Sequence, residues 1–252
     1  MSLNVGKALV DDGACDAILN TAGNIDSDWA VLFLAECDPQ LKSNHQLNFG
    51  RHFSKRFWDG PGSYAFCIVI RNSMTYCLRS MDQQGRACRV HLADGIAMNI
   101  GCIFAHAAHG EELYKSLADA AFLIRTRPRN SNIVLLGDLN VDHLPIFHND
   151  PFSEELNRTD KHKDERMALE QLCAACGVTV HDPTTIIGNP GGPNADHCLS
   201  APITRIPVGD QPGLPLWIDH CASDGCVSKS WIDWTDVPAD HAAVVARCRL
   251  KH

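Results

Sequence analysis

Hydrophobic and polar positions follow two periods along this chain, which predicts a mixture of strands and helices. Short apolar runs bounded by polar residues predict buried strands at 2–5, 29–34 and 133–137. Helical spacing predicts helices over 7–22, 111–126 and 167–177. In the 111–126 segment, Leu113, Leu117 and Ile124 share one face and acidic residues occupy the first turn, as in an amphipathic surface helix.

The remaining strands are predicted to pair antiparallel or to close the fold. Segments 63–70 and 74–79 form one predicted pair, and 86–92 and 99–105 form another. Shorter strands are expected at 178–180 and 216–218, and a last one at 242–250. A polar loop is expected over 142–159 and an irregular excursion over the Pro- and Gly-rich 189–215. Because no repeat or linker divides the chain, we expect a single domain over 1–252.

Composition and charge narrow the class of protein. The 252 residues are 45% hydrophobic and 21% charged, as in an ordinary globular protein, and no apolar run approaches the roughly 20 residues of a membrane helix. The N-terminus lacks the basic and apolar regions of a secretory signal, so we expect a nuclear or cytoplasmic protein that is not secreted. The net charge of −8 argues against a strongly adhesive nucleic-acid binder, but it allows an enzyme whose acids hold a metal.

The 12 cysteines are scattered, and many lie in apolar segments. In a chain of this length they indicate reduced thiols in the core rather than a disulfide framework. Cys173 and Cys176 form a CxxC on the predicted 167–177 helix, where a structural role competes with zinc binding or redox chemistry. No second CxxC or histidine pair follows at zinc spacing, which favours the structural role.

Two basic clusters interrupt the acidic chain. Residues 51–58 interleave cations with aromatic rings, as a groove for single-stranded or distorted nucleic acid does, although a solvated loop fits equally well. Arg125, Arg127 and Arg129 form the second cluster and are candidate DNA contacts.

The most informative motif is Gly137-Asp138-Leu139-Asn140, which ends the strand predicted at 133–137. In an extended backbone Asp138 and Asn140 would point to the same side. A carboxylate beside a donating amide suits a metal-bound phosphate, whereas a strand that simply ends in an Asp/Asn turn is the alternative.

Other polar residues also gather at the ends of predicted strands. Glu36, His106, Asp219 and the pair Asp240-His241 each border an apolar run. Each alone has a structural explanation, but so many in one chain predict a site. Oxygen ligands suit a hard cation, and phosphoryl transfer needs a metal, an activated water and hydrogen-bond donors.

In order along the chain, these residues resemble the motif series of the endonuclease/exonuclease/phosphatase superfamily, the deoxyribonuclease-I-like fold. The series runs from Asn4 and Glu36 through His106 and Gly-Asp138-Leu-Asn140 to Ile-Asp219-His and Ala-Asp240-His241, and it covers residues 3–249. The resemblance implies an α/β protein, a four-layer sandwich of two mixed sheets packed face to face with helices outside. Ala35 and Ala239 depart from the usual Gln and Ser of the motifs. Asp196 competes with Asp219 for the Ile-Asp motif, and the strand-like residues before Asp219 favour Asp219.

The resemblance also implies roles for the motif residues. Glu36, with Asp240 and Asn4, would bind Mg²⁺ or Mn²⁺. Asp138 or His241 would activate the attacking water, and the sequence does not choose between them. Asp219 would orient His241, while His106, Asn140 and Asn4 would donate hydrogen bonds to the phosphoryl oxygens.

Within the superfamily, the chain resembles the endonuclease domain of non-LTR retrotransposons. Its short length, its 181–185 stretch (His-Asp-Pro-Thr-Thr) and its end close to the last strand carry this resemblance. It implies a monomeric enzyme that nicks DNA to leave 5′-phosphate and 3′-hydroxyl ends, within a larger polyprotein that includes a reverse transcriptase. The alternatives are a superfamily relative acting on a small or lipid phosphoester, and a non-catalytic binding module.

Overall fold

The structure is a computed structural model, and it describes residues 1–6, 12–37, 51–59, 64–94, 98–142, 160–188, 204–205, 216–235 and 241–249. The start of the predicted 7–22 helix lies outside these residues. So do nearly all of the predicted 142–159 loop and most of the 189–215 excursion.

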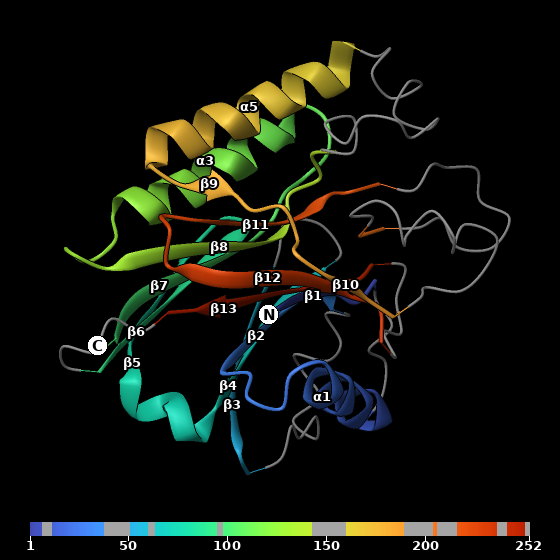
Figure 1. The fold of residues 1–252 in the computed structure, drawn as a ribbon, viewed down its shortest axis with the longest axis vertical. Coiled ribbons are helices and arrows are strands. Elements are labelled where there is room, and N and C mark those ends of the chain that lie inside the picture. Colours follow the sequence, from blue (N-terminus) through green and yellow to red (C-terminus); the bar gives the residue numbers. More distant parts are fainter. Residues whose placement is uncertain are drawn as a thin grey trace, which may run out of the picture.

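Two mixed β-sheets form the centre of the molecule (Figure 1). The seven-stranded sheet has the order β10-β12-β13-β1-β2-β4-β3, and the six-stranded sheet has the order β5-β6-β7-β8-β11-β9. The strands of the first are β10 (Ile186–Ile187), β12 (Val227–Asp233), β13 (Ala243–Cys248), β1 (Ser2–Asn4), β2 (Val31–Cys37), β4 (Ala65–Arg71) and β3 (Phe53–Asp59). Those of the second are β5 (Leu78–Gln84), β6 (Ala87–Asp94), β7 (Met98–His106), β8 (Asn132–Asp138), β11 (Asp219–Ser223) and β9 (Thr179–Val180).

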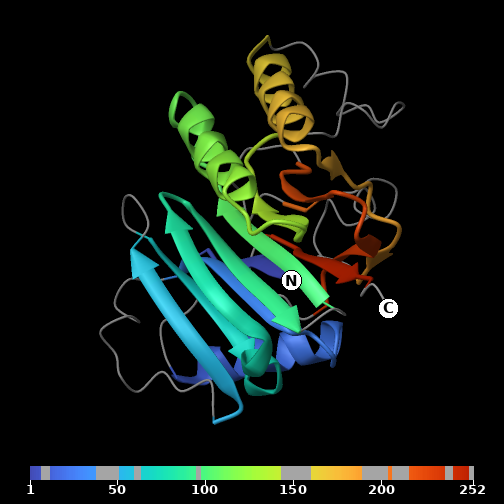
Figure 2. The same cartoon turned by 90° about the vertical axis from the view of Figure 1, so that its left-hand side faces the viewer.

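Helices cover the outer faces of both sheets. Helix α1 (Asp12–Ile25) packs on the seven-stranded sheet, while α3 (Glu112–Arg125) and α5 (Asp160–Cys176) lie together over the six-stranded sheet (Figures 1 and 2). Three hydrophobic clusters separate the four layers. The predicted four-layer α/β sandwich is therefore confirmed. No helix in the described ranges is long and apolar enough to span a membrane.

Strand β2 shows how the sequence pattern produces the layers. Leu32 and Leu34 pack toward α1, whereas Phe33 between them packs into the cluster between the sheets. Because side chains alternate across a strand, a continuous apolar run is what a strand buried on both faces requires. Phe33 stacks on Phe104 of β7 at 5.4 Å between ring centroids, which joins the two sheets.

One predicted strand pair is wrong. Residues 63–70 do contain β4, but β4 pairs with β2 and β3, not with the segment that follows it. Residues Asn72–Cys77 form the 3₁₀ helix η1, after which β5 begins in the other sheet and pairs with β6. The short connection therefore crosses between sheets, a change that local periodicity does not reveal. The second predicted pair is confirmed as β6 and β7.

Several boundaries also differ from the predictions. The 51–58 cluster forms edge strand β3 and not a loop, and strands β10 and β12 were not predicted. Helix α5 begins at Asp160, before the predicted start at 167. The predicted strand at 216–218 is wrong, because Leu216 forms only an isolated bridge with Arg205 and the strand β11 starts at Asp219.

Candidate active site

Strand register gathers the motif residues from the six-stranded sheet into one row. His106 of β7 lies opposite Asp138 of β8 in a parallel ladder, and Asp138 lies opposite Asp219 of β11 in an antiparallel ladder. All three side chains are buried, between 2% and 3% exposed. Neighbouring strands are about 5 Å apart, so the row places two carboxylates and an imidazole within interaction distance.

Asn4 brings the seven-stranded sheet to this row. Its side-chain Nδ2 donates to Asp138 Oδ2 at 3.1 Å and lies 3.5 Å from His241 Nε2. Its Oδ1 accepts the N–H of Gly6, which fixes the orientation of the amide. A buried amide with these partners joins the ends of the two sheets at the centre of the site.

Glu36 projects from a bulge in β2. The β2–β4 register shifts between Leu34 and Cys37, and Glu36 adopts a left-handed backbone with φ of 57°. A bulge redirects a side chain that a regular strand would point elsewhere. Here Glu36 Oε1 lies 2.9 Å from His106 Nε2, and at 22% exposure its side chain is more open to solvent than those of His106 and Asp138.

The Asp138–Asn140 segment does not continue as a strand, so the expectation that both side chains lie on one side of an extended chain is wrong. Asn140 has φ of 50°, and its N–H donates to Asp138 Oδ1 at 3.0 Å. This is a tight turn closed by the aspartate side chain. The Asn140 Nδ2 donates to the Ala107 carbonyl at 2.6 Å, so Asn140 ties the ends of β7 and β8 together.

Gly137 explains why this turn is possible. Its φ is 147°, and a Cβ at this position would lie 1.9 Å from the Ala105 carbonyl oxygen. Only glycine fits a backbone approach this close. The glycine of the motif thus sets the distance between β7 and β8 beside the site.

Asp219 and His241 form a buried hydrogen-bonded pair. His241 Nδ1 lies 2.9 Å from Asp219 Oδ2, which leaves Nε2 facing Asn4. The Thr204 hydroxyl accepts the backbone N–H groups of Ile218 and Asp219 at 3.0 and 2.9 Å. The Thr204 carbonyl also accepts the Ala242 N–H, so Thr204 joins the segments that carry both partners. A carboxylate held in this way orients the imidazole and stabilises its protonated form.

The pKa values of the two carboxyls near His106, those of Asp138 and Glu36, are shifted in opposite directions. Burial, followed by the negative charge of Asp219, raises the pKa of Asp138 to about 6, although His241, His106 and Asn4 partly oppose the shift. Burial also raises the pKa of Glu36, but hydrogen bonding and charge from His106, with help from Asn4, outweigh it and lower the pKa overall. Opposite shifts in neighbouring groups are typical of a site that assigns separate roles to its acids.

The donor set suits a hard divalent cation. Glu36 and Asp138 present carboxylate oxygens, the ligands that Mg²⁺ and Mn²⁺ prefer, whereas Asn4 turns its Nδ2 to the site and its Oδ1 accepts the Gly6 N–H. Within the described residues, Asp138, Asp219 and His241 also offer ligand atoms that all lie within 4.8 Å of one another. The predicted ligand Asp240 lies outside the described residues, as does the competing Asp196.

The structure does not bring the second basic cluster to this site. Arg125 ends α3, and Arg127 and Arg129 lie in the connection to β8, whose first residue is Asn132. Asp138 stands at the other end of that strand. Their role as DNA contacts remains a prediction based on charge alone.

Sequence patterns missed two residues that contact the site. Arg86 Nη1 lies 3.3 Å from His106 Nδ1, and Thr204 holds the backbone of Asp219. Arg86 lies in the Gly85-Arg86 turn between β5 and β6, and the glycine is a signal that could have marked this turn. Thr204 lies in a segment without any periodicity. Cys173 and Cys176 pack in the cluster beneath α3 and α5, and no metal group in the described part of the chain includes them.

Comparison with solved structures finds the same fold in other proteins. A 3′-5′ exonuclease (NExo) from Neisseria meningitidis superposes with a TM-score of 0.66 at 19% identity, with 98% of each chain covered. An AP endonuclease from Archaeoglobus fulgidus gives 0.64 at 16% identity, covering 98% of this chain and 97% of its own. A variant of the 3′ phosphatase NExo from Neisseria, bound to a product DNA hairpin, gives 0.61 at 17% identity, with coverage of 98% and 97%. At these identities the likeness shows the fold alone.

The family is shown by the sequence itself. The model of the Endonuclease/Exonuclease/phosphatase family matches residues 1–240. The chain therefore belongs to the endonuclease/exonuclease/phosphatase family, whose enzymes hydrolyse phosphoesters and generally use divalent metals. A search of curated proteins finds no match.

Proposed function

We propose that this chain is a metal-dependent phosphodiesterase that nicks DNA. The observation that carries the proposal is the convergence of Asn4, Glu36, His106, Asp138, Asp219 and His241 at one end of the sandwich. A binding module has no need of buried carboxylates with opposed pKa shifts beside two imidazoles, and burying such groups costs stability.

The proposed mechanism assigns a task to each side chain. Asp219 holds His241 with Nε2 toward the centre of the site, where His241 or Asp138 takes a proton from the attacking water. Asn4 and His106 donate hydrogen bonds to the phosphoryl oxygens as negative charge builds. Glu36, with Asn4 and with Asp240 from outside the described residues, would hold Mg²⁺ or Mn²⁺. The cation would neutralise negative charge on the phosphate and on the leaving oxygen. Attack in line then leaves a 5′-phosphate and a 3′-hydroxyl.

Two observations bear on the substrate. One solved relative was bound to a DNA hairpin, and the others are an exonuclease and an AP endonuclease, which favours DNA. The net charge of −8 favours the second candidate, a small or lipid phosphoester, because a strongly acidic chain repels polyphosphate backbones. We further propose a retroelement endonuclease, acting as a monomer within a larger polyprotein that carries a reverse transcriptase. That proposal rests on the motif resemblance alone.

The test is the nicking of supercoiled plasmid by the purified chain with Mg²⁺, with Mn²⁺ and with EDTA. We expect nicking with either metal, none with EDTA, and none by His241→Ala. The control is Lys115→Ala, since Lys115 is an exposed residue of helix α3 with no contact to the site groups. Intact plasmid with folded protein would contradict DNA as substrate, and a panel of phosphomonoesters and phosphodiesters would then test the second candidate.

Metal binding has its own test. Glu36→Gln removes one ligand charge, so the metal concentration needed for half-maximal nicking should rise at least tenfold. An unchanged titration would remove Glu36 from the metal site and favour the group of Asp138, Asp219 and His241.

A further inference from the structure

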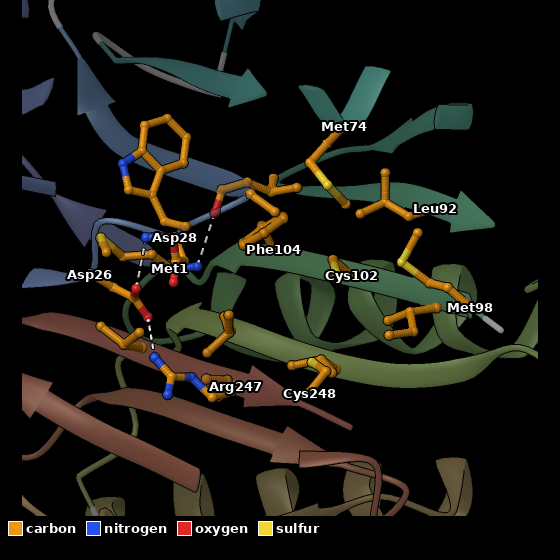
Figure 3. Close-up of a pocket in the computed structure, with 18 residues that line it drawn as sticks. Met1, Asp26, Asp28, Met74, Leu92, Met98, Cys102, Phe104, Arg247 and Cys248 are labelled. Carbon is orange, nitrogen blue, oxygen red and sulfur yellow. Dashed lines mark hydrogen bonds and ion pairs between the residues drawn. The ribbon is translucent and has the colours of Figure 1, made fainter. Parts of the chain in front are cut away.

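The end of the sandwich opposite the active site contains a cavity bordered by thiols. Its volume is about 340 Å³, and it extends between the sheets from Val31 and Cys248 as far as Phe104 and Leu136. Cys102 and Cys248 lie on its walls (Figure 3). Cys248 is half-buried, so a small solute that enters the cavity reaches its sulfur.

Cys226 lies beside Cys248, although the two are far apart in the sequence. The Arg249 N–H donates to the Cys226 carbonyl at 2.8 Å, and Val227 lies opposite Cys248 in the β12–β13 ladder. The register shifts between Val227 and Lys229, so a bulge lies directly beside the two cysteines. The Cys248 thiol is close enough to the Cys226 thiol to raise its pKa. Cys226 is thus one position out of register with Cys248, and because adjacent strands lie about 5 Å apart, residues so related fall within the Cα separation of about 4.4–6.8 Å that a disulfide spans.

The two thiols differ in access and in reactivity. Cys226 is buried, and its Sγ lies 3.4 Å from the carbonyl of Ile133 in the other sheet. The neighbouring Cys248 thiol and burial together raise the pKa of the Cys226 thiol, so Cys226 is the slower of the two to react with an oxidant. Cys248, on the cavity wall, is therefore the thiol that meets a reagent from solvent, and Cys226 is the one positioned to react next.

We propose that Cys226 and Cys248 form a reversible disulfide, in which Cys248 reacts first with an oxidant and Cys226 resolves the product. With hydrogen peroxide, the Cys248 thiol becomes a sulfenic acid and one water is released. The Cys226 sulfur then attacks the Cys248 sulfur, the S–O bond breaks, and the Cys226 proton leaves with the hydroxide as a second water. Two thiols lose two electrons and two protons in total, and the peroxide is reduced by the same two electrons. A cellular dithiol reverses the step.

The bond would close a loop that contains His241. The interval 226–248 includes β12 and β13, and His241 lies just before β13 at the other end of the ladder. Cys226 also follows β11, so the link sits where the chain passes from the six-stranded to the seven-stranded sheet. A cross-link at this point stabilises the hairpin that carries His241 and leaves the site groups themselves unmodified.

The test uses the full chain, treated with hydrogen peroxide and then alkylated, digested and analysed by mass spectrometry without reduction. We expect a cross-linked peptide containing Cys226 and Cys248 that disappears on treatment with dithiothreitol. Closing a loop of about 20 residues should raise the midpoint of thermal unfolding by about 5–10 °C over the reduced protein. Cys226→Ser and Cys248→Ser should each abolish both effects, while Cys173→Ser should retain them.

The mass spectrum of the wild-type protein keeps the proposal testable even if a variant fails to fold. A cross-link from Cys226 to Cys102 or Cys221, or a link between Cys173 and Cys176 alone, would overturn it. So would stable oxidation of Cys248 to sulfinic acid with Cys226 still free. Because the experiment measures no cleavage, its outcome is independent of the proposed nuclease activity.

Discussion

Replacing Asp138 with Asn should stabilise the metal-free protein at neutral pH. The carboxyl is 2% exposed and lies beside Asp219, so its ionised form is costly in the folded protein. Its pKa of about 6 compares with an ordinary value of 3.8, a difference of roughly two units. Each unit corresponds to about 1.4 kcal/mol, so ionisation removes ~3 kcal/mol of stability between low and neutral pH.

The sign follows from the direction of the shift. Since the pKa is raised in the folded state, the protonated carboxyl favours folding below about pH 4. That contribution is lost as the pH rises to 6 and above. Asparagine removes the charge, but its amide cannot accept from Asn4 at the same position, which costs about 1 kcal/mol. The net gain at pH 7.5 is therefore about 2 kcal/mol, a rise of roughly 4–8 °C in the unfolding midpoint.

The assay is thermal unfolding by circular dichroism in EDTA at pH 7.5 and at pH 4.5. The gain should be present at pH 7.5 and absent at pH 4.5. Asp26→Asn is the matched control, because Asp26 faces Arg247 at 3.0 Å instead of a second carboxylate and should give no gain. An Asp138→Asn protein no more stable than wild type at pH 7.5, or equally stabilised at both pH values, would refute the reasoning.

Three further predictions concern the turn at Gly137, the pair of Asp219 and His241, and the second basic cluster. Gly137→Ala should lower the free energy of unfolding in urea by at least about 3 kcal/mol, because the added Cβ would lie 1.9 Å from the Ala105 carbonyl oxygen. Gly23→Ala is the control and should be neutral or stabilising, because nothing lies within 4 Å of the added Cβ. Asp219→Asn should lower the nicking rate by about 10²–10⁴ with an unchanged circular dichroism spectrum, since His241 loses its charged partner, and near-normal rates would remove the pair from the mechanism. If Arg125, Arg127 and Arg129 contact DNA, their replacement by Gln should flatten the salt dependence of binding by about 0.9 per lost contact, and an unchanged slope would assign them to solvated surface.

The sequence predicted the centre of the fold better than its edges. The apolar runs of β2, β7 and β8 are buried on both faces, so hydrophobicity alone identifies them. In the first half of strand β12, Ser228 and Lys229 are exposed, and its pairing with β13 is what makes it a strand. The change of sheet at η1 likewise depends on packing against distant segments, which local periodicity does not record.

For the site, the sequence predicted the residues but not their arrangement. Glu36, His106, Asp138, Asp219 and His241 were found because each borders an apolar run, and the structure brings all five together. The left-handed conformations of Glu36 and Asn140 were not predicted, since they arise from a bulge and from a turn closed by a neighbouring side chain. Thr204 was missed because its role consists of hydrogen bonds to backbone brought near it only by folding.

The candidate site lies where the ends of the two sheets meet, and its side chains come from both sheets. Asn4, Glu36 and His241 belong to the seven-stranded sheet or its ends, whereas His106, Asp138 and Asp219 belong to the six-stranded sheet. The contacts of His106 with Glu36 and of His241 with Asp219 therefore each join one sheet to the other. The relative positions of these side chains therefore depend on how the two sheets pack, and the stacking of Phe33 on Phe104 is one contact that joins them.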